Sequence, residues 1–194
     1  MSHLFESLIA RPLAEKMRPT RLELLVGQEH LLAPDAPLGR MLRERRASSM
    51  ILWGPPGSGK TTLAKIMAEH VNMNFEPLSA VFSGVSDLRK VFDKAVERKK
   101  VGKETLLFVD EIHRFNRAQQ DSFLPFVEDG TVVLVGATTE NPSFELNSAL
   151  LSRCKVFILE KIARAGLEHL VKRAEKLEGK ELPLKQEARD ALLS

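Results

Sequence analysis

The sequence has 194 residues, of which 43% are hydrophobic and 6% aromatic, as is typical of one soluble domain or of one domain with a small appendage. Its 29 basic residues against 26 acidic residues give a net charge of +3, which permits a nucleic-acid partner without requiring one. The single cysteine, Cys154, excludes an internal disulfide and favours a reducing cytoplasm, and the absence of any long apolar run argues against a membrane partner.

Short apolar segments alternate with longer amphipathic ones along the first part of the chain. Four segments have the composition of strands buried on both faces, and 75–79 is a weaker fifth candidate. The four are 50–53, 105–110, 131–138 and 155–159. Helical spacing of apolar residues lies between them, over 63–71 and 88–96. This alternation predicts an α/β fold with a doubly wound, parallel, five-stranded sheet.

The pattern changes near residue 161. Apolar residues at helical spacing then run from Leu167 to Leu177, a further helix begins near Pro183, and no strand follows. We therefore expect an α/β core domain over 1–161. Residues 162–194 are expected to be the beginning of a helical domain that is truncated in mid-helix.

A phosphate-binding loop is the strongest chemical signal. It lies between an apolar strand and an amphipathic helix, as the pattern requires. Its residues are Gly54, Pro55, Pro56, Gly57, Ser58, Gly59, Lys60, Thr61 and Thr62. The glycines allow backbone N–H groups to surround phosphates, Lys60 is expected to reach the β- and γ-phosphates, and the Thr61 hydroxyl to hold Mg²⁺. The predicted cofactors are ATP and Mg²⁺, whereas the alternative is a simple Gly/Pro turn.

Two adjacent carboxylates, Asp110 and Glu111, end the apolar segment 105–110. In a doubly wound sheet this strand end lies near the phosphate loop. Asp110 is therefore predicted to bind Mg²⁺, and Glu111 to orient the attacking water. A small-molecule kinase must keep water away from the γ-phosphate, so Glu111 favours an ATP hydrolase.

Polar residues also follow the next predicted strand, in the segment GATTENPS. Thr139 is predicted to hydrogen-bond the γ-phosphate or the water, with Asn141 as the alternative. The competing interpretation is an ordinary turn, because Asn-Pro is a turn signal.

Together with MRPTRLELLVGQEHLL (17–32) and DGTVVLVGATTENPSFELNSALLSRC (129–154), these motifs resemble the AAA+ ATPases of the clamp-loader branch. More closely, they are similar to the family of replication-associated recombination protein A (RarA, also called MgsA) and the WRN-interacting ATPase. The resemblance runs from about residue 12 to about residue 160. It implies a P-loop NTPase core of the AAA+ type with a helical lid. It also implies DNA-stimulated ATP hydrolysis in replication-fork maintenance, recombination and repair, at the subunit interfaces of a homo-oligomer.

The same resemblance implies partners and further site residues. Expected partners are DNA with forked, gapped or single-stranded ends and replication proteins such as single-strand binding protein, in a cytoplasmic, nucleoid-associated location. The adenine pocket is expected at Arg18, Pro19, Val26, Gly27 and Gln28. The family continues into a lid with a second sensor arginine and a C-terminal oligomerisation domain, neither of which is found in these 194 residues.

Arg153 lies in a Ser-Arg-Cys element, residues 152–154. In the clamp-loader branch this element directs its arginine toward the ATP of the neighbouring subunit, so the resemblance implies that Arg153 acts in trans. The alternative is a solvated surface arginine.

Three other functions stay open: a small-molecule kinase, a nucleotide-gated scaffold with little hydrolysis, and a motor subunit of the clamp-loader or branch-migration type. Two basic clusters, one over 40–46 and the other at Lys90, Lys94 and Arg98, are expected to be solvated faces rather than DNA contacts. Phe82 lies where many AAA+ rings carry a pore loop, but a buried position is expected.

Overall fold

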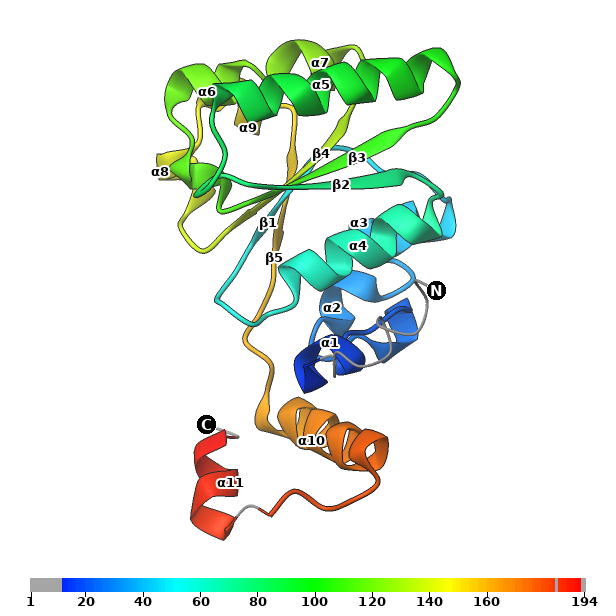
Figure 1. Ribbon diagram of the computed structural model, residues 1–194, viewed down its shortest axis with the longest axis vertical. Helices are drawn as coiled ribbons and strands as arrows, with labels where there is room; N and C mark the ends of the chain where they lie inside the picture. Colours follow the sequence, from blue (N-terminus) through cyan, green and yellow to red (C-terminus); the bar gives the residue numbers. More distant parts are fainter. Residues whose placement is uncertain (1–11, 184, 193–194) are drawn as a thin grey trace, which may run out of the picture. The chain divides into compact units, whose positions relative to one another are not determined.

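The computed structural model describes residues 12–183 and 185–192. These residues fall into two compact units, Gly27–Lys161 and the described parts of Met1–Val26 and Ile162–Ser194. Figure 1 shows the elements of both along the chain. None of the helices in the described residues is long and apolar enough to cross a membrane.

The unit Gly27–Lys161 is built on one parallel sheet of five strands in the order β2-β3-β4-β1-β5. The strands are β1 (Met50–Trp53), β2 (Asn74–Ser79), β3 (Thr105–Asp110), β4 (Val133–Thr138) and β5 (Lys155–Ile158). In register, Trp53 at the end of β1 lies opposite Thr138 of β4. The predicted α/β fold with a five-stranded parallel sheet is confirmed, and the weaker candidate is strand β2.

Helices cover both faces of this sheet. In Figure 1, α5, α6, α7 and α9 lie on one face, and α3 and α4 lie on the other. The helices of this unit are α2 (Glu29–Leu32), α3 (Pro37–Arg43), α4 (Lys60–His70), α5 (Val85–Lys100), the 3₁₀ helix η2 (Ile112–Arg114), α6 (Arg117–Asp121), α7 (Leu124–Glu128), α8 (Pro142–Glu145) and α9 (Ser148–Leu151).

The burial of strand β3 on both faces explains why its sequence is a continuous run of apolar residues. Leu107 and Val109 belong to the core cluster that contains Leu88 and Phe92 of α5. Successive side chains of a strand point to opposite faces, so Leu106 and Phe108 are buried on the other face. Both faces of β3 are thus free of water, and each such leucine stabilises the fold by about 1.5 to 3 kcal/mol.

The other unit contains α1 (Leu13–Met17), the 3₁₀ helix η1 (Leu22–Leu24), α10 (Arg164–Glu178) and α11 (Gln186–Leu192). Lys16 of α1 forms an ion pair with Glu178 at the end of α10, at 3.1 Å. Gly179 follows α10 in the left-handed region (φ 67), which ends this helix as glycine commonly does.

Candidate nucleotide site

The phosphate loop joins β1 to α4, as the sequence predicts. A Cβ atom on Gly54 would lie 2.4 Å from the carbonyl oxygen of Leu159, so only glycine fits there. Gly57 and Gly59 have φ angles of 76° and 95°, in the left-handed region that favours glycine. Gly59 is the N-cap of α4, so the first N–H groups of that helix are directed at the loop. Such a turn can surround an anion.

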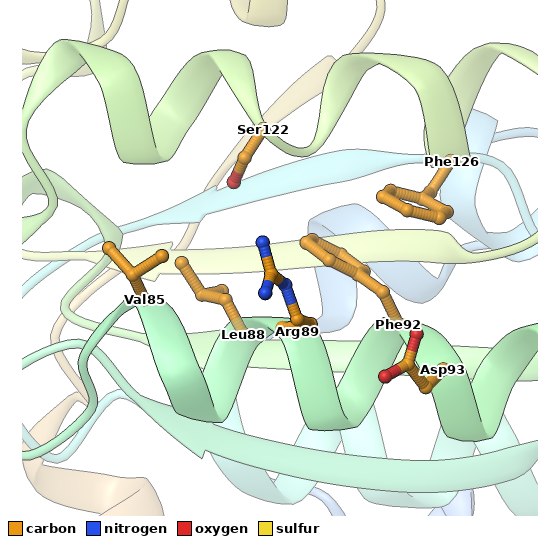
Figure 2. Close-up of a pocket in the computed structure, with 7 residues that line it drawn as sticks. All are labelled: Val85, Leu88, Arg89, Phe92, Asp93, Ser122 and Phe126. Atoms are coloured by element: carbon orange, nitrogen blue, oxygen red, sulfur yellow. The ribbon is translucent and has the colours of Figure 1, made fainter.

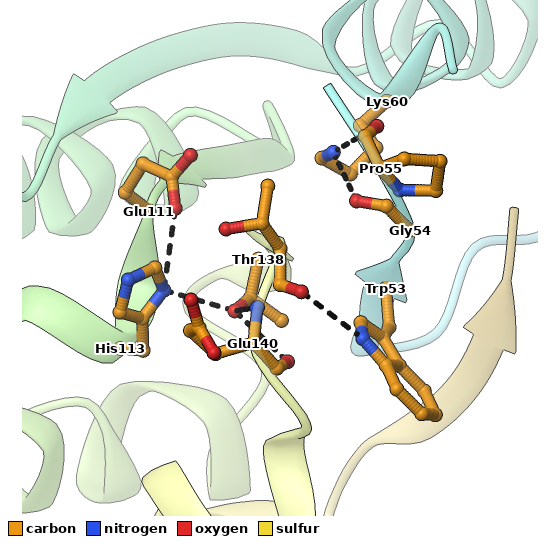
Figure 3. A network of polar contacts seen from close by, with 9 residues as sticks. Trp53, Gly54, Pro55, Lys60, Glu111, His113, Thr138 and Glu140 are labelled. Carbon is orange, nitrogen blue, oxygen red and sulfur yellow. Dashed lines mark hydrogen bonds and ion pairs between the residues drawn. The ribbon is translucent and has the colours of Figure 1, made fainter. Parts of the chain in front are cut away.

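Lys60 is the first residue of α4, and its side chain is largely buried beside the loop. Its Nζ donates hydrogen bonds to the carbonyl oxygens of Gly54 at 2.7 Å and Pro55 at 2.9 Å (Figure 3). Burial lowers the pKa of Lys60, and the carboxylates of Glu111 and Asp110 act in the opposite direction. Lys60 and the two carboxylates therefore interact electrostatically, as a phosphate site with a metal requires.

Asp110 ends β3, and Glu111 follows with φ 52 and ψ 46, a left-handed conformation that is uncommon for a residue with a side chain. The oxygen ligands predicted for Mg²⁺, the Thr61 hydroxyl and the Asp110 carboxylate, have the chemistry that this ion prefers, since Mg²⁺ binds few protein groups besides phosphates and water. The residues present therefore fit the predicted ion.

His113 was missed by the sequence reasoning. Its Nδ1 lies 3.2 Å from Oε2 of Glu111 and 2.9 Å from Oγ1 of Thr138, at the end of β4 (Figure 3). The imidazole side chain is only 8% exposed. The one signal in the sequence is its position shortly after the two carboxylates, which does not by itself reveal these contacts.

Thr139 directly follows β4 and is half-buried. Its carbonyl oxygen accepts a hydrogen bond from Nε1 of Trp53 at 3.3 Å, which fixes its backbone beside the phosphate loop. The alternative residue, Asn141, caps α8 by accepting a hydrogen bond from the N–H of Ser143 at 3.0 Å. Because that side chain already has a structural partner, Thr139 stays our choice for the polar contact.

The five residues expected at the adenine pocket divide between the two units. Gln28 is fully buried, and its amide nitrogen donates to the carbonyl oxygens of Ser58 at 3.2 Å and Glu160 at 2.9 Å. Its Oε1 accepts from the N–H of Glu160 at 3.1 Å. The side chain thus links the phosphate loop to the segment after β5. Gly27 lies in the same unit, whereas Arg18, Pro19 and Val26 belong to the other.

Arg153 follows α9 at the surface. Its guanidinium forms an ion pair with Glu128 and donates to the carbonyl oxygen of Ala149 at 2.8 Å. The side chain is 38% exposed. The sequence pattern does not indicate that Glu128 is the partner of Arg153 within the same chain.

The two basic clusters differ in their surroundings. Lys90 pairs with Asp87, and both Lys94 and Arg98 pair with Glu76. Within the part of the chain that the structure describes, the four arginines of the other cluster are exposed and form no ion pair: Arg40, Arg43, Arg45 and Arg46.

The expectation that Phe82 is buried is wrong, because its side chain is 89% exposed. It lies in the turn between β2 and α5, where the backbone N–H of Phe82 donates to Ser79. Among the residues that the structure describes, nothing packs over this turn to cover the ring. Nearby, a pocket of about 330 Å³ lies between α5 and α6–α7, away from the phosphate loop (Figure 2). Its lining residues are Val85, Leu88, Arg89, Phe92, Asp93, Ser122 and Phe126.

Comparison with known proteins gives the family. The model of the "ATPase family associated with various cellular activities (AAA)" matches residues 50–161. Replication-associated recombination protein A of Haemophilus influenzae is 52% identical over 163 residues, which are 84% of this chain and 36% of that protein. The protein of that name in Escherichia coli K12 is 52% identical over 164 residues, covering 84% of this chain and 37% of the relative. ATPase WRNIP1 of Dictyostelium discoideum is 56% identical over 162 residues, 84% of this chain and 18% of that protein.

Among solved structures, the RuvB Holliday junction branch migration motor of Thermotoga maritima superimposes with a TM-score of 0.66 and 31% identity, over 84% of this chain and 55% of that one. The chain spans only 36% to 37% of the length of the bacterial relatives named above. The family match and the sequence identities nevertheless indicate the same kind of protein as the phosphate loop, the order of the strands and the carboxylates at the end of β3. The chain belongs to the AAA family of ATPases, in the branch that contains replication-associated recombination protein A and WRNIP1.

Proposed function

We propose that this chain binds ATP with Mg²⁺ and hydrolyses it, and that the intact protein does so as an oligomer stimulated by DNA during replication, recombination and repair. The single observation that carries the hydrolytic assignment is Glu111. Its carboxylate follows β3, interacts electrostatically with Lys60 and is held by His113. A carboxylate fixed there can direct a water molecule at a phosphate on the loop.

Each of the other residues has a role in this proposal. Lys60 and the loop N–H groups compensate phosphate charge, while Thr61 and Asp110 would hold Mg²⁺, which neutralises charge on the transferred group. Glu111 orients the water and accepts its proton. Thr139 hydrogen-bonds the γ-phosphate or the water. Arg153 acts on the ATP of the adjacent subunit, and its exposed position at the end of α9 supports that assignment.

The names of the relatives and the motif pattern support a role with DNA. We propose forked, gapped or single-stranded ends as the DNA partners, with single-strand binding protein among the protein partners, in the cytoplasm close to the nucleoid. The likeness to the RuvB motor favours one second candidate, a motor subunit of the branch-migration type.

The test is phosphate release by the intact protein, measured without DNA and with forked, gapped, single-stranded and four-way-junction DNA. Stimulation that is largest on forked or gapped DNA supports the proposal, whereas stimulation mainly by the four-way junction supports the branch-migration motor. Nucleotide binding with no phosphate release on any DNA would identify a scaffold. Turnover only with an added small-molecule acceptor would identify a kinase.

A further inference from the structure

We propose that His113 is a positioning residue, which holds the carboxylate of Glu111 against the end of strand β4 and thereby couples the water-directing group to the phosphate loop. The inference rests on the proposed function, because it takes Glu111 as the group that orients water. It assigns to His113 a role in turnover without direct contact with substrate.

The local backbone brings the imidazole back beneath Glu111. Strand β3 ends at Asp110, Glu111 adopts the left-handed conformation, and η2 begins at Ile112. A left-handed residue with a side chain costs of order 1 kcal/mol and persists only where its surroundings hold it. The contacts of His113 with Glu111 and Thr138 supply that restraint at the exit of the strand.

The hydrogen-bond partners of Thr138 indicate which ring nitrogen of His113 carries a proton. The Thr138 hydroxyl donates to the carbonyl oxygen of Glu140 at 3.2 Å and accepts from the N–H of Glu140 at 3.0 Å. Its single proton is then in use, so the remaining lone pair accepts from Nδ1 of His113. The Glu111 carboxylate, 3.2 Å from the same nitrogen, is also an acceptor when ionised. Nδ1 therefore carries a proton that is shared between the two oxygens.

This shared proton fixes the orientation of Glu111. The Glu111 side chain is 32% exposed, so a partner is needed to hold its carboxylate in one rotamer. The imidazole, at 8% exposure, is itself held by packing and can act as that fixed donor. A catalytic group misplaced by about 1 Å can lose about 100-fold in rate, so such a restraint is expected to matter for turnover.

Thr138 also connects His113 to the phosphate loop. The carbonyl oxygen of Thr138 accepts a hydrogen bond from the N–H of Gly54, the first residue of the loop, at 3.1 Å. Thr138 thus bonds to His113 through its side chain (Figure 3) and to the loop through its backbone carbonyl oxygen. A shift of the loop relative to β4 would reach Glu111 through three contacts: Gly54 to Thr138, Thr138 to His113, and His113 to Glu111.

The test uses two replacements in the intact protein. His113→Leu keeps the bulk of the side chain but removes the donor, whereas His113→Asn keeps an N–H donor attached to Cγ, as Nδ1 is in histidine. We expect His113→Leu to lower kcat roughly 10- to 100-fold, with affinity for a non-hydrolysable ATP analogue changed by less than about 3-fold. His113→Asn should recover most of that loss. Equal impairment of both variants, or a wild-type kcat in His113→Leu, would overturn the proposal.

A double-mutant cycle with Thr138→Val separates coupling from general damage. If His113 acts through both partners, Thr138→Val lowers kcat in the wild-type background but has little further effect in His113→Leu. If the losses of kcat in the two single variants simply multiply in the double variant, or if they accompany a matching fall in melting temperature, the coupling is contradicted. Glu111→Gln is the separate control for the proposed function. If it still turns over ATP, the role of Glu111 fails; if it is inactive while His113→Leu is normal, only the role of His113 fails.

Discussion

Arg153 and Glu128 form an ion pair within one chain, between the segment after α9 and the last residue of α7. Both side chains are well exposed, at 38% and 49%, so water screens their attraction. The pair therefore orients the guanidinium at the surface without fixing it there. A phosphoryl group carries more charge than a carboxylate and offers more oxygens, so it can replace Glu128 as the partner.

The first prediction follows from the weakness of this pair. Glu128→Gln keeps the size of the side chain and removes its charge, and it should change the free energy of unfolding by less than about 1 kcal/mol. Urea denaturation measures this directly. A loss above about 2 kcal/mol would mean that the pair is part of the fold and that Arg153 is not available to a neighbouring subunit.

The second prediction separates nucleotide binding from turnover. Lys60→Ala should abolish ATP binding, because the buried ammonium is proposed to compensate phosphate charge in the bound state. Glu111→Gln should preserve binding and remove turnover, because Glu111 is proposed to act on the attacking water. Fluorescent-nucleotide titration and phosphate release measure the two properties. Equal loss of ATP affinity in both variants would contradict this division of roles.

The sequence pattern indicates where the phosphate loop and the two carboxylates lie in the fold, because these places depend on neighbours in the chain. The phosphate loop directly follows β1, Asp110 is the last residue of β3 and Glu111 follows it, and parallel strands bring their carboxyl ends to one edge of the sheet. The buried runs of β1 and β3 are equally clear, because both faces of these strands are covered.

Contacts between distant segments could not be predicted in this way. His113 reaches Thr138 only because Glu111 turns the chain into the left-handed region, a conformation that the sequence pattern does not indicate. Glu76 meets Lys94 and Arg98 from a different element. Phe82 is exposed although its residue type favours burial, since local hydrophobicity says nothing of what packs over a turn.

The third prediction concerns Glu76, whose side chain is 14% exposed and lies 3.0 Å from Lys94 and 2.8 Å from Arg98. Burial alone would raise its pKa, but the two cations together outweigh burial and lower the pKa below its ordinary value of 4.5. A lowered carboxyl pKa adds stability above the unfolded value, and this stability is lost as the pH falls through the folded value.

Glu76→Gln should therefore reduce the free energy of unfolding by about 1 to 2 kcal/mol at pH 7. The difference from the wild type should shrink as the pH falls below 4.5. Denaturant unfolding at several pH values measures both effects. A difference that stays constant down to acidic pH would show that the carboxylate charge is not its source.

The fourth prediction distinguishes the two basic clusters as DNA contacts. Lys90, Lys94 and Arg98 already have carboxylate partners, so they should neutralise few DNA phosphates. Their replacement should therefore leave the salt dependence of DNA binding nearly unchanged.

Replacement of Arg43, Arg45 and Arg46, which are exposed and have no ion pair among the described residues, should instead reduce the slope of log K against log salt by roughly two to three. Fluorescence anisotropy with forked DNA at several salt concentrations compares the two triple variants under the same conditions. The larger change in the lysine-containing variant would reverse the assignment.

The fifth prediction returns to Arg153 and asks whether it acts on the nucleotide of its own subunit or of the next one. Arginine fingers in other nucleotide hydrolases contribute about 10³- to 10⁵-fold in rate, whereas a surface arginine contributes almost nothing. Arg153→Ala subunits keep Lys60 and Glu111 but supply no arginine. Glu111→Gln subunits keep the arginine but cannot direct water. We expect each variant alone to be nearly inactive.

When the two variants of the intact protein are mixed, ATPase activity should return. A site that keeps Glu111 in one subunit then borders an Arg153 from the other. Phosphate release against the mixing ratio should pass through a maximum, since the productive interface needs one subunit of each kind. Mixing either variant with Lys60→Ala,Glu111→Gln,Arg153→Ala subunits is the matched control and should restore nothing. If the variants co-assemble, shown by cross-linking of differently labelled subunits, and the mixture stays inactive, Arg153 does not act in trans.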